Sequence, residues 1–103
     1  MNLVVFITAA DKKEAEAIAR SLVEERLAAC VNIIEGVSSL FRWQGKVEKA
    51  SEALLIVKSR KALMNKLIKK IKSLHSYELP EIIALPVISG EKRYLEWVDD
   101  STR

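Results

Sequence analysis

The sequence predicts a single α+β domain, in which two helices cover one face of a four-stranded sheet. The chain of 103 residues has room for one domain and little more. Half of its residues are hydrophobic, with only 3 glycines and 2 prolines, so we expect a packed core and exclude disordered or collagen-like structures. Segments with the apolar pattern of a strand alternate with segments that have the pattern of a helix.

The N-terminal part of the chain predicts a strand followed by a helix. Residues 3–8 form a short apolar, β-branched run, which indicates a buried strand near the centre of the sheet. Asp11 is placed to cap a helix that runs to about Arg26, and Glu14 follows in the spacing of a capping box. The apolar residues of this helix recur on one face: Ala15, Ile18, Ala19, Leu22 and Val23.

The middle of the chain predicts a long β-hairpin. Its first arm covers residues 28–43, where Gly36 permits a bend or bulge, and its second arm covers residues 46–58. Gln44 and Gly45 supply the turn between the arms. We expect the tip of this hairpin to project beyond the core.

The last part of the chain predicts a helix, a strand and a short final helix. Apolar residues recur at helical spacing through residues 63–74, an apolar run at 82–88 indicates a strand, and residues 91–98 can form a helix. The resulting order is that of a ferredoxin-like βαββαβ sandwich with a long β-hairpin and an extra C-terminal helix. Several strands carry apolar residues on both faces, so we expect a second copy of the chain to cover the face without helices.

Charge and cysteine content indicate a soluble cytoplasmic protein. The net charge is only +3, and the single cysteine, Cys30, excludes an intrachain disulfide and fits a reducing compartment. No apolar stretch approaches the roughly 20 residues of a membrane span, and the apolar run near the N-terminus lacks a basic region before it. We therefore expect no membrane association.

A basic run at residues 58–72 holds seven lysines and arginines and no acidic residue. A solvated helix face explains this run, because its lysines fill the positions between the apolar residues of the predicted helix. RNA binding is the alternative, but the neighbouring strand lacks the aromatic residues on which RNA bases stack. We therefore expect no nucleic-acid partner.

Candidate metal ligands are few. His75, the only histidine, stands at the end of a predicted helix, where it either forms helix-terminal hydrogen bonds or binds a metal with Glu78 or Glu81. Cys30 is either a small buried hydrophobe or a soft ligand for copper or zinc. One histidine and one thiol do not complete a tetrahedral site, so any metal site must be open, weak or shared between chains.

Aromatic residues and catalytic motifs give two further indications. Trp43, Tyr77, Tyr94 and Trp97 fit either a contact between subunits or the wall of a ligand pocket. The chain contains no Walker loop and no GxGxxG, GxSxG or HExxH motif, so we do not expect an enzyme.

Five segments of the chain together resemble the CutA family of divalent-cation tolerance proteins. The joint occurrence of Leu-Ala-Ala-Cys-Val-Asn, Trp-x-Gly-Lys and Leu-His-x-Tyr-x-x-Pro, in that order, is the specific part of the resemblance. The five segments cover residues 8–11, 25–33, 39–48, 74–82 and 94–97.

The resemblance implies a compact homotrimer, similar in architecture to PII signalling proteins, that associates with copper and other divalent metals. His75 and Cys30 match the histidine and cysteine of family motifs, whereas Ile7 and Leu74 stand where some members carry a further cysteine and histidine. The resemblance thus implies weak metal binding or none. It also places five residues in clefts between subunits: Trp43, Lys58, Tyr77, Glu81 and Trp97.

An alternative function follows from the same clefts. The protein is then a PII-like trimeric sensor whose intersubunit cleft binds a small anionic ligand near Lys58, with Trp43 or Trp97 as a wall.

Overall fold

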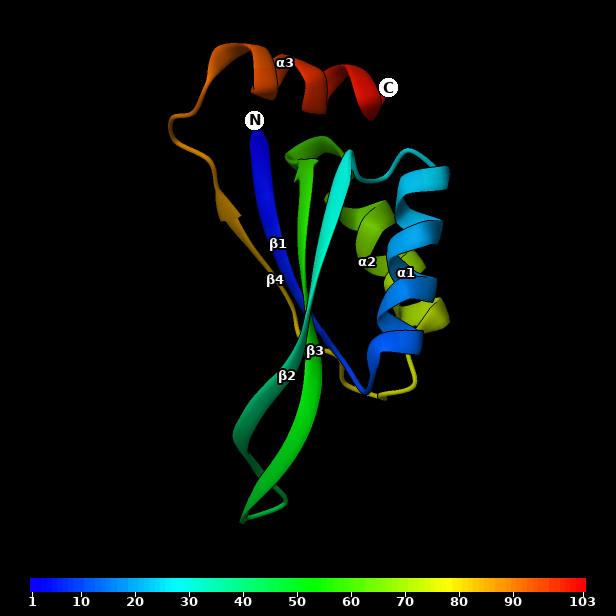
Figure 1. Cartoon of the computed structure of the whole chain (residues 1–103), viewed down its shortest axis with the longest axis vertical. Helices are drawn as coiled ribbons and strands as arrows, with labels where there is room; N and C mark the ends of the chain where they lie inside the picture. Colours follow the sequence, from blue (N-terminus) through cyan, green and yellow to red (C-terminus); the bar gives the residue numbers. More distant parts are fainter.

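The chain forms two layers, a four-stranded antiparallel sheet and a pair of helices on one of its faces (Figure 1). The computed structural model describes residues 1–103. The strands lie in the order β2-β3-β1-β4, which confirms the ferredoxin-like sandwich and the central position of the first strand. The elements in chain order are β1 (Asn2–Ala9), α1 (Lys12–Glu24), β2 (Cys30–Trp43), β3 (Lys46–Arg60), η1 (Lys61–Leu63), α2 (Met64–Leu74), β4 (Ile82–Pro86) and α3 (Lys92–Ser101).

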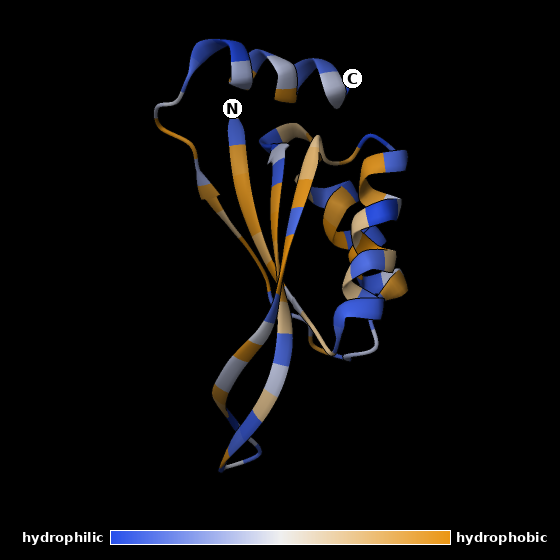
Figure 2. Cartoon of the chain, in the orientation of Figure 1, coloured by the Kyte–Doolittle hydropathy of each residue, from blue (hydrophilic) through white to orange (hydrophobic).

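The core lies between the sheet and helices α1 and α2. In β1 every second side chain is buried, and in β3 the buried positions alternate in the same way from Ala53 to Ser59. Ile18 and Leu22 of α1 and Leu67 and Ile71 of α2 are fully enclosed against this face. Figure 2 shows hydrophobic residues along the strands of the body and bands of hydrophobic and hydrophilic residues along both helices.

Helix α1 begins as the sequence predicts and ends two residues earlier. The Glu14 backbone N–H donates to Asp11 Oδ1 at 2.8 Å, as in a capping box, whereas Glu14 Oε1 accepts from Ala10 N–H rather than from Asp11. At the other end Arg26 has a φ of 59°, and the Leu27 N–H donates to Leu22 O. This is a Schellman motif with arginine in the position that glycine usually occupies.

The hairpin of β2 and β3 extends well beyond the two-layered body (Figure 1), and the molecule measures 44 × 25 × 23 Å. Gln44 and Gly45 both have positive φ, which defines the type I′ turn that fits the twist of a two-residue hairpin. Between Ile34 and Val37 the register shifts by one residue, with Gly36 at a φ of 70°. The bulge predicted at Gly36 is confirmed.

The C-terminal elements differ slightly from the predicted boundaries. Strand β4 ends at Pro86, two residues early, because proline cannot donate a ladder hydrogen bond and is tolerated only on an edge strand. Helix α3 begins at Lys92 and continues to Ser101, three residues past the predicted end. The Arg60 guanidinium donates to the Thr102 hydroxyl at 2.9 Å and to its backbone carbonyl at 2.8 Å, which ties the end of α3 to β3.

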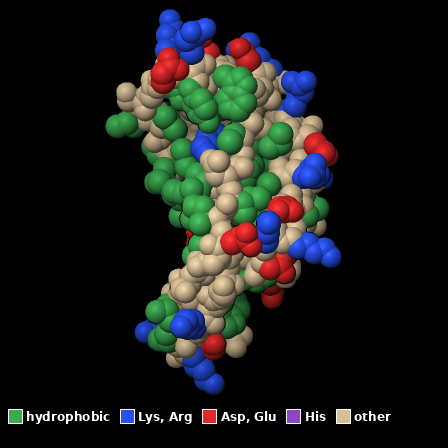
Figure 3. Space-filling view, in the orientation of Figure 1, with side chains coloured by type: hydrophobic (Ala, Val, Ile, Leu, Met, Phe, Trp, Pro, Cys, Tyr) green, Lys and Arg blue, Asp and Glu red, His purple; other side chains and the backbone are tan.

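The second face of the sheet, which we call the open face, has no helix layer over most of its area. Ile83 and Leu85 of β4 pair with Phe6 and Val4 of β1 and point away from the core. They are 54% and 52% exposed, and Ile34 of β2 is 47% exposed. Figure 3 shows hydrophobic side chains gathered below α3 and again at the hairpin tip. None of the helices is both long and apolar enough to cross a membrane.

Candidate functional site

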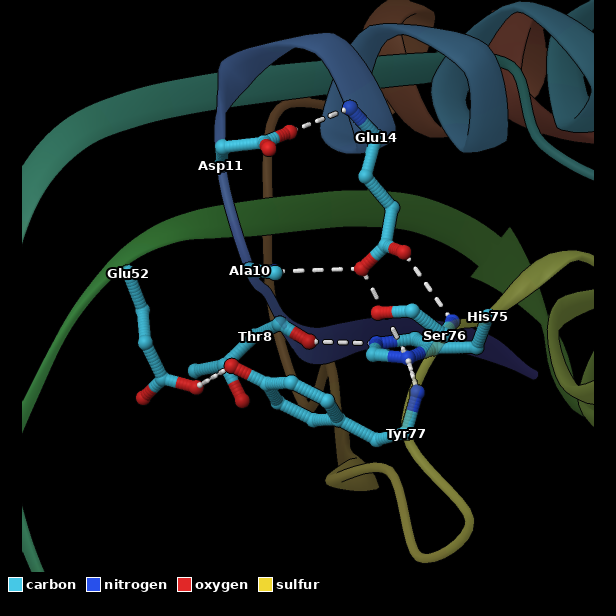
Figure 4. Close-up of polar contacts among 8 residues, drawn as sticks. All are labelled: Thr8, Ala10, Asp11, Glu14, Glu52, His75, Ser76 and Tyr77. Carbon is cyan, nitrogen blue, oxygen red and sulfur yellow. Dashed lines mark hydrogen bonds and ion pairs between the residues drawn. The ribbon is translucent and has the colours of Figure 1, made fainter.

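His75 lies in a polar network at the end of α2, beneath the last residues of β1 (Figure 4). Its side chain is fully buried. Ring atom Nε2 lies 2.7 Å from the backbone oxygen of Thr8, and Nδ1 lies 3.0 Å from the backbone nitrogen of Tyr77. The imidazole thus connects the end of a central strand to the loop that follows α2.

These two partners fix the tautomer of His75. The Thr8 carbonyl can only accept, so Nε2 carries the proton, and the Tyr77 N–H can only donate, so Nδ1 is the unprotonated nitrogen. Both ring nitrogens are therefore used by hydrogen bonds within the chain, and neither offers a free lone pair to a metal. Of the two predicted roles, hydrogen bonding is the one the structure contains, although the bonds reach β1 and the following loop instead of the last turn of α2.

Glu14 extends this network from the first turn of α1. One carboxylate oxygen accepts from the Ala10 N–H at 3.1 Å, and the other accepts from the Ser76 N–H at 3.0 Å. Burial raises the pKa of Glu14, but hydrogen bonds from the Ser76 side chain and from both backbone N–H groups outweigh burial, so the pKa is lowered overall. Glu14 is thus a charged clamp between α1 and the loop after α2.

The lowered pKa of Glu14 predicts a loss of stability in acid. A carboxyl group with a depressed folded-state pKa stabilises the fold above its unfolded-state pKa, near 4.3, and loses this contribution as pH falls through the folded-state value. We expect Glu14→Gln to cost about 1–3 kcal/mol at pH 7 and to flatten the decline of stability below about pH 5. Urea unfolding of both proteins between pH 3 and 7 measures the difference.

Glu16→Gln is the matched control for this prediction. It removes a carboxylate from the same helix, but the Glu16 side chain is 56% exposed and pairs only with Lys12. Its stability profile should follow that of the unmodified chain. If Glu14→Gln and Glu16→Gln give the same profile, the clamp role of Glu14 is wrong.

Tyr77 carries the network to the base of the hairpin. Its hydroxyl donates to Glu52 Oε2 at 2.8 Å. Burial of the phenol and the adjacent Glu52 carboxylate raise the pKa of Tyr77 to about 12, so the hydroxyl remains a donor at neutral pH. The side chain of Glu52 is thereby held at the point where β3 leaves the body of the molecule.

A cleft of about 570 Å³ opens between the hairpin and the loop at residues 77–81, and we call it the hairpin cleft. Three of the predicted cleft residues, Trp43, Tyr77 and Glu81, line it together. The remaining lining residues are Thr8, Ser38, Ser39, Leu40, Phe41, Glu52, Leu79 and Pro80.

Three further predicted residues, Cys30, Lys58 and Trp97, lie at the opposite end of the sheet, whereas Glu78 lies beside Tyr77 and Trp43. Cys30 pairs with Lys58, and Lys58 donates a hydrogen bond to Asn32. Trp97 belongs to α3 and packs against Tyr94 in a tilted arrangement, with ring centroids 5.5 Å apart. A cleft that contains Lys58 and Trp97 together with Trp43 therefore requires residues from two chains.

The predicted metal ligands do not form a site within one chain. Nowhere in the structure do three or more histidine, cysteine or acidic side chains lie close enough together to hold a metal ion. Cys30 lies level with Val4 of β1, whereas His75 bonds to Thr8, about 13 Å further along the strand. His75, Cys30 and Glu78 thus do not fit a metal centre of a single chain.

Sequence reasoning missed three residues of this site. Glu14 was visible only as a capping residue, although its second carboxylate oxygen reaches Ser76. Thr8 contributes a backbone oxygen, which no side-chain pattern reveals. Glu52 stands in the polar half of a predicted hairpin arm, and nothing in the sequence relates it to Tyr77.

The fold and the site together define a class of protein: a ferredoxin-like domain with a projecting hairpin, a cleft at the base of that hairpin and an apolar sheet face that no helix covers. Residues 3–101 match the family described as "CutA1 divalent ion tolerance protein". The chain belongs to this family, which confirms the resemblance noted in the sequence.

Relatives and solved structures agree with this family. A divalent-cation tolerance protein CutA of Thermus thermophilus is 48% identical over 99% of this chain and 99% of its own length. The chloroplastic protein CutA of Arabidopsis thaliana is 44% identical over 99% of this chain, which spans only 56% of that relative. The solved structure of the divalent cation tolerance protein (Cut A1) from T. thermophilus superposes with a TM-score of 0.98 at 48% identity and covers 100% of both chains.

Proposed function

We propose that this chain functions in divalent-cation tolerance as a cytoplasmic homotrimer that binds copper or another divalent cation weakly. The family to which the chain belongs and the names of its relatives support the role in cation tolerance. The names of the family and of the Thermus thermophilus relative describe tolerance proteins and state no enzymatic reaction.

The apolar open face is the observation that supports an assembly of several chains. Ile83, Leu85 and Ile34 are each about half exposed on one side of the sheet. An antiparallel sheet with one polar face needs no cover, whereas a contiguous apolar face marks an interface. A second copy of the chain presents the same chemistry, and closed symmetric assembly buries every copy of the face.

Metal binding in this proposal depends on the assembly. Both ring nitrogens of His75 are used by hydrogen bonds, and Cys30 lies at the other end of the sheet. The predicted ligands that remain on the hairpin side are two exposed carboxylates of the loop before β4, Glu78 and Glu81. Two carboxylates from one chain give few ligands, which fits weak binding or a site completed by a neighbouring chain.

Native mass spectrometry of the purified protein during a Cu(II) titration tests both parts of the proposal. We expect a trimer that takes up to three copper ions. The double variant Glu78→Gln/Glu81→Gln should keep the trimer and bind less copper, while the matched variant Glu96→Gln, on the exposed side of α3, should behave as the unmodified chain.

Two results would contradict this proposal. A monomer at micromolar concentration would refute the assembly. A trimer that binds no copper at moderate excess would refute metal binding while leaving the assembly intact.

A further inference from the structure

We propose that the helix layer of the chain binds an acidic, extended segment of a partner protein. The contact surface is a groove between the end of α1 and helix α2, which we call the lysine groove. Both helices lie on the side of the sheet opposite the open face (Figure 1), so an assembly through the open face leaves this groove accessible. The proposal therefore depends neither on the metal site nor on contacts between copies of the chain.

The positive charge of the chain is concentrated along η1 and α2. Five lysines lie within twelve consecutive residues, with no acidic residue among them: Lys61, Lys66, Lys69, Lys70 and Lys72. Removing these five charges from the net charge of +3 leaves −2 for the rest of the chain. The surface of α2 therefore attracts anions, whereas the remainder of the molecule has no excess of positive charge.

Most of these lysines have no partner of opposite charge. Only Lys70 forms an ion pair, in which its Nζ lies 2.8 Å from Glu25 Oε2. Lys66 and Lys69 are exposed and lie three positions apart on the same helix. Like charges at this spacing repel each other, and an anionic partner would relieve that repulsion.

The lysine groove has the shape and spacing for an extended peptide. It has a volume of about 320 Å³ and is lined by Glu25, Leu27, Lys66, Lys69, Lys70 and Ser73. The lining positions of α2 are three or four residues apart, so they share one side of the helix and succeed one another at about 4.5–6 Å along its axis. An extended peptide places every second side chain on one side, about 6.6 Å apart. Acidic residues at alternate positions can therefore meet successive lysines.

An acidic protein segment fits this surface better than a nucleic acid or a membrane. Neither α1 nor α2 contains an aromatic residue on which a base could stack. Helix α2 also contains no arginine, the residue whose geometry best matches phosphate. Its apolar residues Leu67 and Ile71 are fully buried in the core, so they cannot insert into a bilayer.

Fluorescence anisotropy with three labelled peptides tests the proposal. The peptides consist of four Glu-Ser, four Gln-Ser or four Lys-Ser repeats and carry the same dye. The full chain is used in its own assembly at pH 7 and low salt, with EDTA present to exclude metal effects. We expect the acidic peptide to bind at least about tenfold more tightly than the neutral one, and the basic peptide to bind most weakly. The affinity for the acidic peptide should fall steeply as salt is added.

The first pair of variants locates the binding on α2. Lys66→Gln/Lys69→Gln should weaken binding of the acidic peptide about fivefold or more. The matched variant Lys12→Gln/Lys13→Gln removes the same charge from the same helix layer, but at the far end of α1 from Glu25. We expect it to change the affinity less than about twofold.

The second pair of variants acts in the opposite direction. Glu25→Gln removes the only carboxylate of the lysine groove and frees Lys70, so we expect binding to become about twofold tighter or more. A folding defect would not produce such a gain. Glu24→Gln is the control, because Glu24 pairs with Arg20 and does not line the lysine groove. It should leave the affinity nearly unchanged.

The proposal is overturned if the acidic and neutral peptides bind equally, if no peptide binds, or if the two double-lysine variants lose affinity equally. It is also overturned if Glu25→Gln weakens binding of the acidic peptide. Tighter binding of an oligouridine RNA or of phosphatidylserine vesicles than of the acidic peptide, lost in Lys66→Gln/Lys69→Gln, would assign the lysine groove to a nucleic acid or a membrane instead.

Discussion

His75→Ala should lower the free energy of unfolding by about 2–4 kcal/mol, with or without metal present. The fully buried imidazole donates to the Thr8 carbonyl and accepts from the Tyr77 N–H. Alanine leaves both backbone groups without a partner and creates a cavity between β1 and the loop at 75–81. Because that loop carries Tyr77, we also expect its bond to Glu52 to weaken.

Guanidinium chloride unfolding in EDTA, at one fixed protomer concentration, measures this effect. The fixed concentration is needed because an assembly links stability to mass action. His75→Asn can still accept from the Tyr77 N–H and His75→Gln can still donate to the Thr8 carbonyl, so each should recover part of the loss. An alanine variant as stable as the unmodified chain in EDTA, yet deficient in metal binding, would show that His75 is a ligand instead of a structural bridge.

The local structure of this chain could be predicted from its sequence because neighbouring residues determine it. The alternation in β1, the Gln44-Gly45 turn and the bulge at Gly36 all depend on contacts within a few positions. The end of α1 is the exception. There Arg26 adopts positive φ, a conformation for which only glycine or asparagine would have given a signal.

The candidate site was predicted in pieces and not as a network. His75 and Tyr77 were singled out by residue type, but their partners are 67 and 25 positions away along the chain. Those contacts depend on the register of β1 with β3 and on the path of the loop after α2. Neither can be derived from periodicity. The same holds for Lys58 and Trp97, whose distance from the hairpin cleft follows only from the strand pairing and the position of α3.

Leu85→Lys should convert the proposed assembly into monomers. Leu85 lies on edge strand β4 and is 52% exposed on the open face. In an isolated chain this change would cost little, because the lysine stem can lie along the sheet while its ammonium group reaches water. In an assembly that covers the open face, each copy would bury an unpaired charge, which costs several kcal/mol per protomer.

Light scattering after size-exclusion chromatography measures the mass of each variant, and circular dichroism reports whether the fold persists. Val23→Lys is the matched control: Val23 is 44% exposed, but it lies on α1, on the helical side of the molecule. We expect it to keep the mass of the unmodified protein. The two substitutions introduce the same charge at similarly exposed positions, so only coverage of the open face can give the two variants different masses. If both variants keep the mass of the unmodified protein, the open face is not the contact between chains.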